Sequence, residues 1–279
     1  MFEVGGVSFL FKFKTKHPVI QQRVKEQYRH YFCNKKPDIF VEIECRSSVK
    51  KPNFKKLLID ASAWKLWEKD THYLLYFTKE RGISFAEINS AFNRVKFYTE
   101  DPSGQLLLYL LPEVLLGVVL PQKNAMIVHA CGVLANRKAY FFVAPSGGGK
   151  STIAKLALRE GFSVLNDDRI IIRKEDNLFK IDGNPWHGEL KDSSNISLYV
   201  KNVFFLNKAR SNKIRYMSKR EAVLGFLKNS LYLPINNDIF NKGFGICCDL
   251  AKALNCYWMD FRADKTIWRF LDEFFKNDT

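Results

Sequence analysis

The 279-residue chain lacks several features that would assign it quickly to a class. Its six cysteines form no C-x-x-C pair, and no histidine stands beside them at zinc-finger spacing, so a zinc-finger fold is excluded. The adjacent Cys247 and Cys248 have poor geometry for a structural disulfide. We therefore expect reduced thiols and a cytoplasmic protein. The sequence also contains no internal repeat and no low-complexity linker.

Long uninterrupted apolar runs are missing as well. The most apolar stretch, residues 106–120, contains Pro112 and Glu113 and is short for a membrane span. It predicts a buried helix instead. Near the N-terminus, Glu3 occupies the region where a signal peptide would be basic. We therefore expect no membrane span and no signal peptide.

Positive charge is plentiful, but no dense basic run stands out. Lys and Arg number 44 against 29 Asp and Glu, which gives a formal net charge of +15. Such a field attracts nucleotides, acidic peptides, anionic membranes and nucleic acid alike. Because the basic residues are spread along the whole chain, the pattern does not favour nucleic acid as the partner.

The predicted elements change character along the chain. Residues 1–110 contain stretches of alternating apolar and polar residues, such as 38–45, and predict a mostly antiparallel, β-rich region. Residues 111–279 mix strands and helices and predict a second domain. The expected fold class is therefore α/β, or mixed α+β. Substrate recognition by the aromatic-rich N-terminal region is a hypothesis.

Two helix predictions rest on simple patterns. Apolar and aromatic residues at helical spacing predict a helix over residues 18–32. Residues 238–254 are also expected to be helical in part, with interruptions at Gly243 and Gly245. A third helix, over residues 218–228, begins with Ser218 and Glu221 at the spacing of a capping box.

The clearest motif is A-P-S-G-G-G-K-S at residues 144–151. It matches the phosphate-binding consensus G-x-x-x-x-G-K-[ST] except at its first glycine, where Ala144 stands. A predicted strand over 139–143 precedes it and a predicted helix over 150–159 follows it, which is the context that a phosphate loop requires. The predicted nucleotide contacts are Ser146, Gly147, Gly148, Gly149, Lys150, Ser151 and Thr152. Lys150 would reach the β- and γ-phosphates, and the Ser151 hydroxyl would ligate Mg²⁺.

An acidic pair, Asp167 and Asp168, follows the strand that comes directly after the loop's helix. Ligands of doubly wound sheets bind beyond the carboxyl ends of strands, so we expect the pair near the γ-phosphate. One carboxylate would hold Mg²⁺ and the other would accept a proton from an attacking hydroxyl. The sequence does not decide which takes which role. A plain turn-initiating cluster is the structural alternative.

Taken together, these motifs resemble a known family. His129-x-x-Gly132 on one strand, the loop of residues 146–151 on the next, and the Asp167-Asp168 pair resemble the HPr kinase/phosphorylase C-terminal domain. That family is similar in fold to ATP-dependent phosphoenolpyruvate carboxykinases. The segment of residues 183–189 looks more like HPr-kinase-related serine kinases encoded beside bacterial peptide-modification genes, including those acting on lasso-peptide precursors.

The resemblance covers about residues 113–270. It implies a serine kinase that uses ATP and Mg²⁺ and acts on a small protein or a ribosomally made peptide. The implied catalytic residues are His129, Lys150, Asp167 and Asp168, and the implied metal contacts are Ser151, Asp168 and Glu189. The chain lacks the longer glycine-rich signature of true HPr kinases, and residues 1–110 do not look like their N-terminal domain, so HPr is not implied as the substrate.

Several alternatives stay open. A small-molecule kinase would also carry acidic residues after the loop's helix, and a nucleotide-binding regulator or ATPase would also use the positive field. Without the resemblance, His129 would be interpreted as a core residue of an apolar strand. Trp186 and His187 would either contact a ligand or belong to a packed turn. The oligomeric state is equally open.

Overall fold

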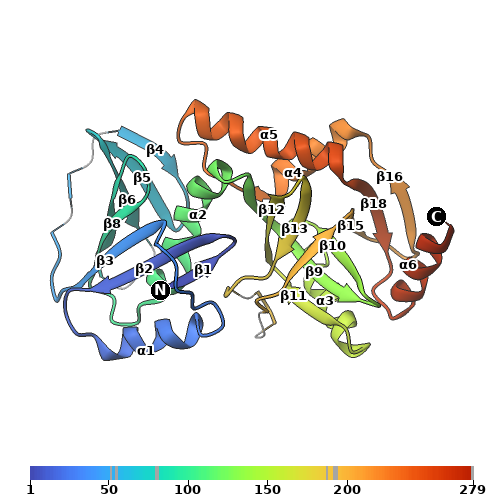
Figure 1. Cartoon of the computed structure of the whole chain (residues 1–279), viewed down its shortest axis with the longest axis horizontal. Coiled ribbons are helices and arrows are strands. Elements are labelled where there is room, and N and C mark those ends of the chain that lie inside the picture. Colours follow the sequence, from blue (N-terminus) through green and yellow to red (C-terminus); the bar gives the residue numbers. More distant parts are fainter. Residues whose placement is uncertain (51, 54–55, 79–81, 187, 191–193, 278–279) are drawn as a thin grey trace. The chain divides into compact units, whose positions relative to one another are not determined.

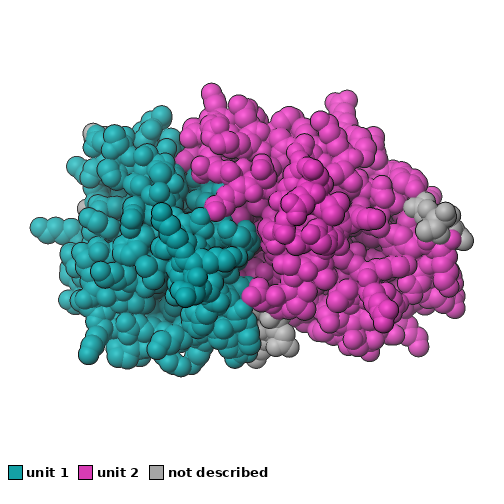
Figure 2. Space-filling view, in the orientation of Figure 1, with its two compact units in different colours: residues 1–119 teal, residues 120–279 magenta. Residues whose placement is uncertain are grey.

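The computed structural model describes residues 1–50, 52–53, 56–78, 82–186, 188–190 and 194–277 (Figure 1). The chain divides into two compact units, residues 1–119 and residues 120–279 (Figure 2). The division falls within helix α2 (Leu111–Gln122), whereas the sequence analysis divided the chain after residue 110. Within the described ranges, no helix is both long enough and apolar enough to cross a membrane.

Unit 1 is built on one sheet with the strand order β1-β2-β3-β8-β7-β6-β5-β4. The pairs β2–β3 and β3–β8 are parallel and the others are antiparallel, which confirms the prediction of a mostly antiparallel region. The strands are β1 (Phe2–Val4), β2 (Val7–Phe13), β3 (Ile39–Cys45), β4 (Lys56–Asp60), β5 (Trp64–Lys69), β6 (His72–Phe77), β7 (Ser84–Asn89) and β8 (Arg94–Thr99).

The helices of unit 1 are α1 (Pro18–Gln27) and the π-helical turn η1 (Leu106–Leu110), which leads into α2. Helix α1 ends at Gln27, so its predicted extension to residue 32 is wrong. The reason is tertiary packing at Tyr28, whose buried ring stacks on Phe2 with 3.8 Å between the ring centroids. The Tyr28 hydroxyl also donates a hydrogen bond to the Leu108 carbonyl at 2.7 Å.

Unit 2 contains a mixed sheet with the order β14-β13-β12-β9-β10-β15-β18-β16, and β11 and β17 also pair with β9. The strands are β9 (Ala125–Ala135), β10 (Lys138–Val143), β11 (Ser163–Asn166), β12 (Arg169–Glu175), β13 (Leu178–Asp182), β14 (Ser197–Val200), β15 (Asn202–Lys208), β16 (Lys213–Tyr216), β17 (Ser230–Leu231) and β18 (Asn255–Phe261). The helices are α3 (Lys150–Arg159), α4 (Lys219–Asn229), α5 (Asn237–Ala253) and α6 (Thr266–Asn277).

Helices cover both faces of this sheet (Figure 1). On one face, Phe226 of α4 and Leu250 of α5 share a buried cluster with Phe205 of β15. On the other face, Ile153 of α3 and Leu271 of α6 share a second buried cluster. The mixed α/β class expected from the sequence is therefore what the structure has.

Helix α5 corrects one prediction, because Gly243 and Gly245 do not interrupt it. The helix begins at an Asn236 cap, whose side chain accepts the Ile239 backbone N–H at 2.9 Å. A Cβ on Gly243 would lie 2.5 Å from the Tyr232 ring. The glycine therefore permits close packing against that ring, which offsets its low helix propensity.

Candidate functional site

Four strands of unit 2 end at the same edge of the sheet. Strands β10, β15 and β18 are mutually parallel neighbours, and β9 runs antiparallel to both β10 and β11. The carboxyl ends of β10, β11, β15 and β18 therefore share one edge. The residues that end these strands are Val143, Asn166, Lys208 and Phe261. The candidate site is assembled from the loops at this edge.

The predicted phosphate loop follows β10 at this edge and leads into α3. Helix α3 has the expected bounds, and β10 begins one residue earlier than expected. Gly147 and Gly149 adopt φ angles of +75° and +104°, a region that favours glycine. Gly149 caps α3 and has no side chain to satisfy the first N–H groups of the helix. Such a helix N-terminus favours an anion. Ser146 and Gly147 are exposed, and Ser151 and Thr152 are partly buried.

Lys150 is folded back inside this loop. Only 5% of its surface is exposed, and its Nζ donates hydrogen bonds to the carbonyls of Ala144 at 3.0 Å and Pro145 at 2.9 Å. Burial lowers the pKa of Lys150 below its usual value, although the negative charges of Asp168 and Asp167 oppose this effect. The ammonium is therefore close enough to the acidic pair to interact with both members.

Asp168 lies beside His129, 39 positions earlier in the chain. His129 Nε2 is 2.6 Å from Asp168 Oδ1, and the imidazole is the donor because a carboxylate only accepts. Arg169 donates to the other carboxylate oxygen at 2.7 Å. Burial raises the pKa of Asp168, but the hydrogen bond from His129 and the charge of Arg169 outweigh it, so the pKa is lowered. The carboxylate is thus held ionised, with about a quarter of its surface exposed.

Asp167 has a different environment. It is 1% exposed, and its two oxygens accept the backbone N–H groups of Gly188 at 3.2 Å and Glu189 at 3.1 Å. A Cβ on Gly188 would lie 2.8 Å from Asp167 Oδ1, so this close approach requires a glycine. The sequence alone does not assign the roles of the pair. In the structure Asp167 anchors a loop, and Asp168 presents the more exposed carboxylate.

The loop anchored by Asp167 places Glu189 near the start of α3. The Glu189 carboxylate pairs with Lys155 at 2.5 Å. This hydrogen bond and charge lower the pKa of Glu189 most, and the Ser151 hydroxyl and the charge of Lys208 add to the effect. Two of the three predicted metal contacts, Ser151 and Glu189, are therefore neighbours.

The donor set suits Mg²⁺ held jointly with a nucleotide. Over the described part of the chain, no three His, Cys, Asp or Glu side chains gather into a metal cluster. Mg²⁺ typically takes one or two carboxylates and completes its shell with waters and phosphate oxygens. Ser151 and Glu189 offer such a partial shell, whereas the third predicted contact, Asp168, accepts hydrogen bonds from His129 and Arg169. Bound there, the ion would neutralise charge on the phosphates.

A buried polar network around Asn166 holds the backbone at the acidic pair. The Asn166 amide oxygen accepts the backbone N–H groups of Asp168 at 2.9 Å and Arg169 at 3.0 Å. Its amide nitrogen donates to the carbonyl of Trp186. Trp186 is 2% exposed, so the packed-turn interpretation of this residue is right and ligand contact by its ring is wrong. His187 lies outside the described residues.

The sequence patterns did not point to three residues that the structure brings to this edge, Arg169, Lys155 and Lys208. Arg169 opposes His129 in the β9–β12 register and pairs with Asp168. Lys155 is one helical turn beyond Ser151 and pairs with Glu189. For Lys208, the signal available in the sequence was a basic residue at the end of a predicted strand.

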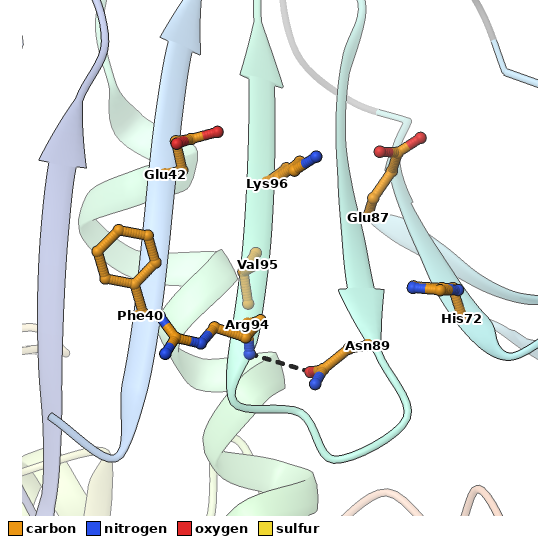
Figure 3. Close-up of a pocket in the computed structure, with 8 residues that line it drawn as sticks. All are labelled: Phe40, Glu42, His72, Glu87, Asn89, Arg94, Val95 and Lys96. Atoms are coloured by element: carbon orange, nitrogen blue, oxygen red, sulfur yellow. Dashed lines mark hydrogen bonds between the residues drawn. The ribbon is translucent and has the colours of Figure 1, made fainter.

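A hollow of about 330 Å³ lies elsewhere, on the sheet of unit 1 (Figure 3). It is lined by Phe40, Glu42, His72, Glu87, Asn89, Arg94, Val95 and Lys96. The Arg94 guanidinium lies 5.1 Å from the centroid of the Phe40 ring, and Glu42 forms an ion pair with Lys14 at 2.8 Å. A second hollow of about 200 Å³ shares His72 and Glu87 with it. No residue of the predicted nucleotide site lines either hollow.

Comparisons with known proteins add little to this geometry. No family model matches the chain, and neither does any curated protein. Among solved structures, the HPr(Ser) kinase/phosphatase from Coxiella burnetii is similar with a TM-score of 0.33 and 12% sequence identity. That match covers 55% of this chain and 95% of the other. It is a distant likeness in fold, and the roles proposed below rest on contacts within this chain.

Proposed function

We propose that unit 2 is an ATP- and Mg²⁺-dependent kinase that phosphorylates a serine hydroxyl of a small protein or a ribosomally made peptide. The observation that carries the proposal is the position of the His129–Asp168 pair. It lies at the sheet edge where the phosphate loop begins, since the Ala144 N–H donates to the His129 carbonyl at 3.3 Å. The charge of Asp168 also acts on Lys150. Proton acceptor and phosphate-binding groups are thus adjacent.

The reaction assigned to these groups is an in-line displacement. The serine Oγ attacks the γ-phosphorus, a new Oγ–P bond forms, and the bond to the bridging β–γ oxygen breaks to release ADP. The hydroxyl proton passes to the Asp168 carboxylate, which His129 and Arg169 orient. Because this transition state is loose, a carboxylate of low pKa suffices. Lys150 and the α3 N-terminus stabilise charge on the phosphates.

We propose further that the acceptor binds to the hollow on unit 1. Its lining includes Arg94 and Lys96 along with Glu42 and Glu87, so it offers both signs of charge beside the Phe40 ring. A peptide segment carries partners for all of these groups. The unit also supplies surface that a metabolite kinase does not need.

The proposal is tested by incubating the full chain with Mg²⁺, γ-labelled ATP and small proteins and peptides encoded beside its gene. Mass spectrometry then identifies phosphoserine. Asp168→Asn is expected to lower the transfer rate by about 10²–10⁴-fold while ATP still binds. Asp249→Asn is the matched control, because Asp249 is an exposed acid of α5 that pairs with Lys174. It should retain the wild-type rate.

Two results would count against this function. Label found only on a metabolite or as free phosphate would support the small-molecule kinase or the ATPase instead. A rate for Asp168→Asn equal to that of Asp249→Asn would remove the proton-accepting role of Asp168.

A further inference from the structure

Lys208, the last residue of β15, lies directly against the phosphate loop. Its Cε is 3.4 Å from the position that a Cβ would occupy on Gly149, the residue that caps α3. The ring of Phe261, which ends the neighbouring strand β18, lies 2.5 Å from the same position. The Lys208 stem therefore runs beside the first turn of α3, and the residue is exposed.

Lys208 adds a cation beside a helix N-terminus, which itself carries partial positive charge. Lys150 interacts with the charges of the acidic pair, and Lys155 pairs with Glu189. Glu189 interacts with both Lys155 and Lys208, but its carboxylate is already paired with Lys155. Placing a further cation beside a helix N-terminus is unfavourable unless an anion binds between them. A chain of phosphates is such an anion.

We propose that Lys208 is a further nucleotide-binding residue. Its ammonium binds the phosphates held at the N-terminus of α3 from the exposed side of the loop, whereas Lys150 binds them from within. Lys208 therefore contributes to affinity for nucleoside tri- and diphosphates and does not contribute to affinity for a monophosphate. This inference rests on the proposed function, because it assumes that the loop binds a nucleotide.

A purely structural role for Lys208 makes different predictions. If its stem only packs against Gly149 and Phe261, methionine would replace it without loss. Lys208→Met keeps most of the stem and removes the charge, and Lys208→Arg keeps the charge. Lys201 offers a matched control, because it is an exposed lysine immediately before the other end of β15.

The experiment is calorimetric titration of the full chain with ATP, ADP and AMP in the presence of Mg²⁺. Lys208→Met is expected to weaken ATP and ADP binding by about tenfold, the loss of one charged contact. AMP affinity should be unchanged for this variant. Lys201→Met should bind ATP within about twofold of wild type, and Lys208→Arg should recover most of the loss. Without nucleotide, Lys208→Met should unfold at or slightly above the temperature of the other three proteins, because it removes a cation from the N-terminus of α3.

The failures of the two proposals are distinguishable. Unchanged ATP affinity in Lys208→Met overturns the role of Lys208, and a raised acceptor KM in that variant would assign the ammonium to the acceptor instead. A tenfold loss of ATP affinity, with no acceptor ever phosphorylated, upholds Lys208 and overturns the kinase. Wild-type protein that binds no ATP overturns both.

Discussion

Replacing Lys150 by methionine separates nucleotide binding from folding. The Lys150 ammonium is buried, and its lowered pKa indicates that keeping the charge there costs free energy. Of its two carbonyl partners, that of Pro145 also accepts the Gly148 N–H at 3.1 Å and so stays satisfied. The Ala144 carbonyl loses its Lys150 donor, and this cost offsets the gain from removing a buried charge. Without nucleotide, Lys150→Met should therefore unfold close to the wild-type temperature. With ATP the wild-type protein should unfold at the higher temperature.

The magnitude follows from linkage. At an ATP concentration 100 times Kd, the wild-type protein gains about 2.7 kcal/mol of stability. Loss of a hydrogen bond to a charged group costs about 1.5–3 kcal/mol, which raises Kd by about 10–150-fold. At the same ATP concentration the variant then gains only about 0.3–1.4 kcal/mol. At roughly 2–4 °C per kcal/mol for a unit of this size, ATP shifts wild type by about 5–11 °C and the variant by at most about half as much.

The assay is differential scanning calorimetry of the full chain, with and without ATP and Mg²⁺, following the transition that ATP moves. Lys201→Met serves as the charge-matched control and should show the wild-type shift. A wild-type protein without any ATP-dependent shift would refute nucleotide binding by residues 144–151. A full shift in Lys150→Met would refute the role of its ammonium.

The pH dependence of the nucleotide-free protein tests the same burial cost. Because the folded pKa of Lys150 is lowered, the unfolded chain binds its proton more tightly than the folded chain does. Wild-type stability should therefore rise with pH between that lowered pKa and about 10.4, the value for the unfolded chain. Lys150→Met should lack this rise. Parallel stability curves for the two proteins would contradict the assigned direction.

Three further changes test the surroundings. Gly149→Ala forces a Cβ to within 2.5 Å of the Phe261 ring at a φ of +104°, so it should abolish the ATP-dependent shift in calorimetry. Gly245→Ala is the control and should keep the shift, because a Cβ there meets nothing within 4 Å. Asn166→Ala leaves two backbone N–H groups without their acceptor, and a loss of about 1–3 kcal/mol is expected in denaturant unfolding. Arg94→Ala should raise the acceptor KM in steady-state kinetics without changing kcat; an unchanged KM would contradict acceptor binding at the unit 1 hollow.

Local signals in the sequence predicted the elements of unit 2 well. The glycine-rich loop fixed the boundary between β10 and α3, and Ser218 and Glu221 form the capping box that begins α4. The errors came where tertiary contacts decide. Gly243 in α5 is tolerated because it packs on a ring from outside the helix, and Tyr28 ends α1 because it packs on the sheet. Such contacts join residues that the sequence does not show to be neighbours.

The same limit applies to the candidate site. The motif around Lys150 could be predicted because all of its parts are adjacent in sequence. The contact of His129 with Asp168 depends on the pairing of β9 with β12, and Lys208 reaches the loop only because β15 lies next to β10. Spacing in the sequence does not show which strands pair. The sequence could therefore identify the acidic pair as site residues but could not assign a role to each aspartate.

The structure gives the two aspartates different partners. Asp167 and Asp168 lie in the bend between β11 and β12. Asp167 accepts the N–H groups of Gly188 and Glu189, and Asp168 accepts a hydrogen bond from His129. The Asp167 carboxylate thus holds the loop that brings Glu189 to α3, whereas Asp168 keeps a more exposed carboxylate beside His129. Under the proposed function, the first aspartate would position a metal contact and the second would accept the hydroxyl proton.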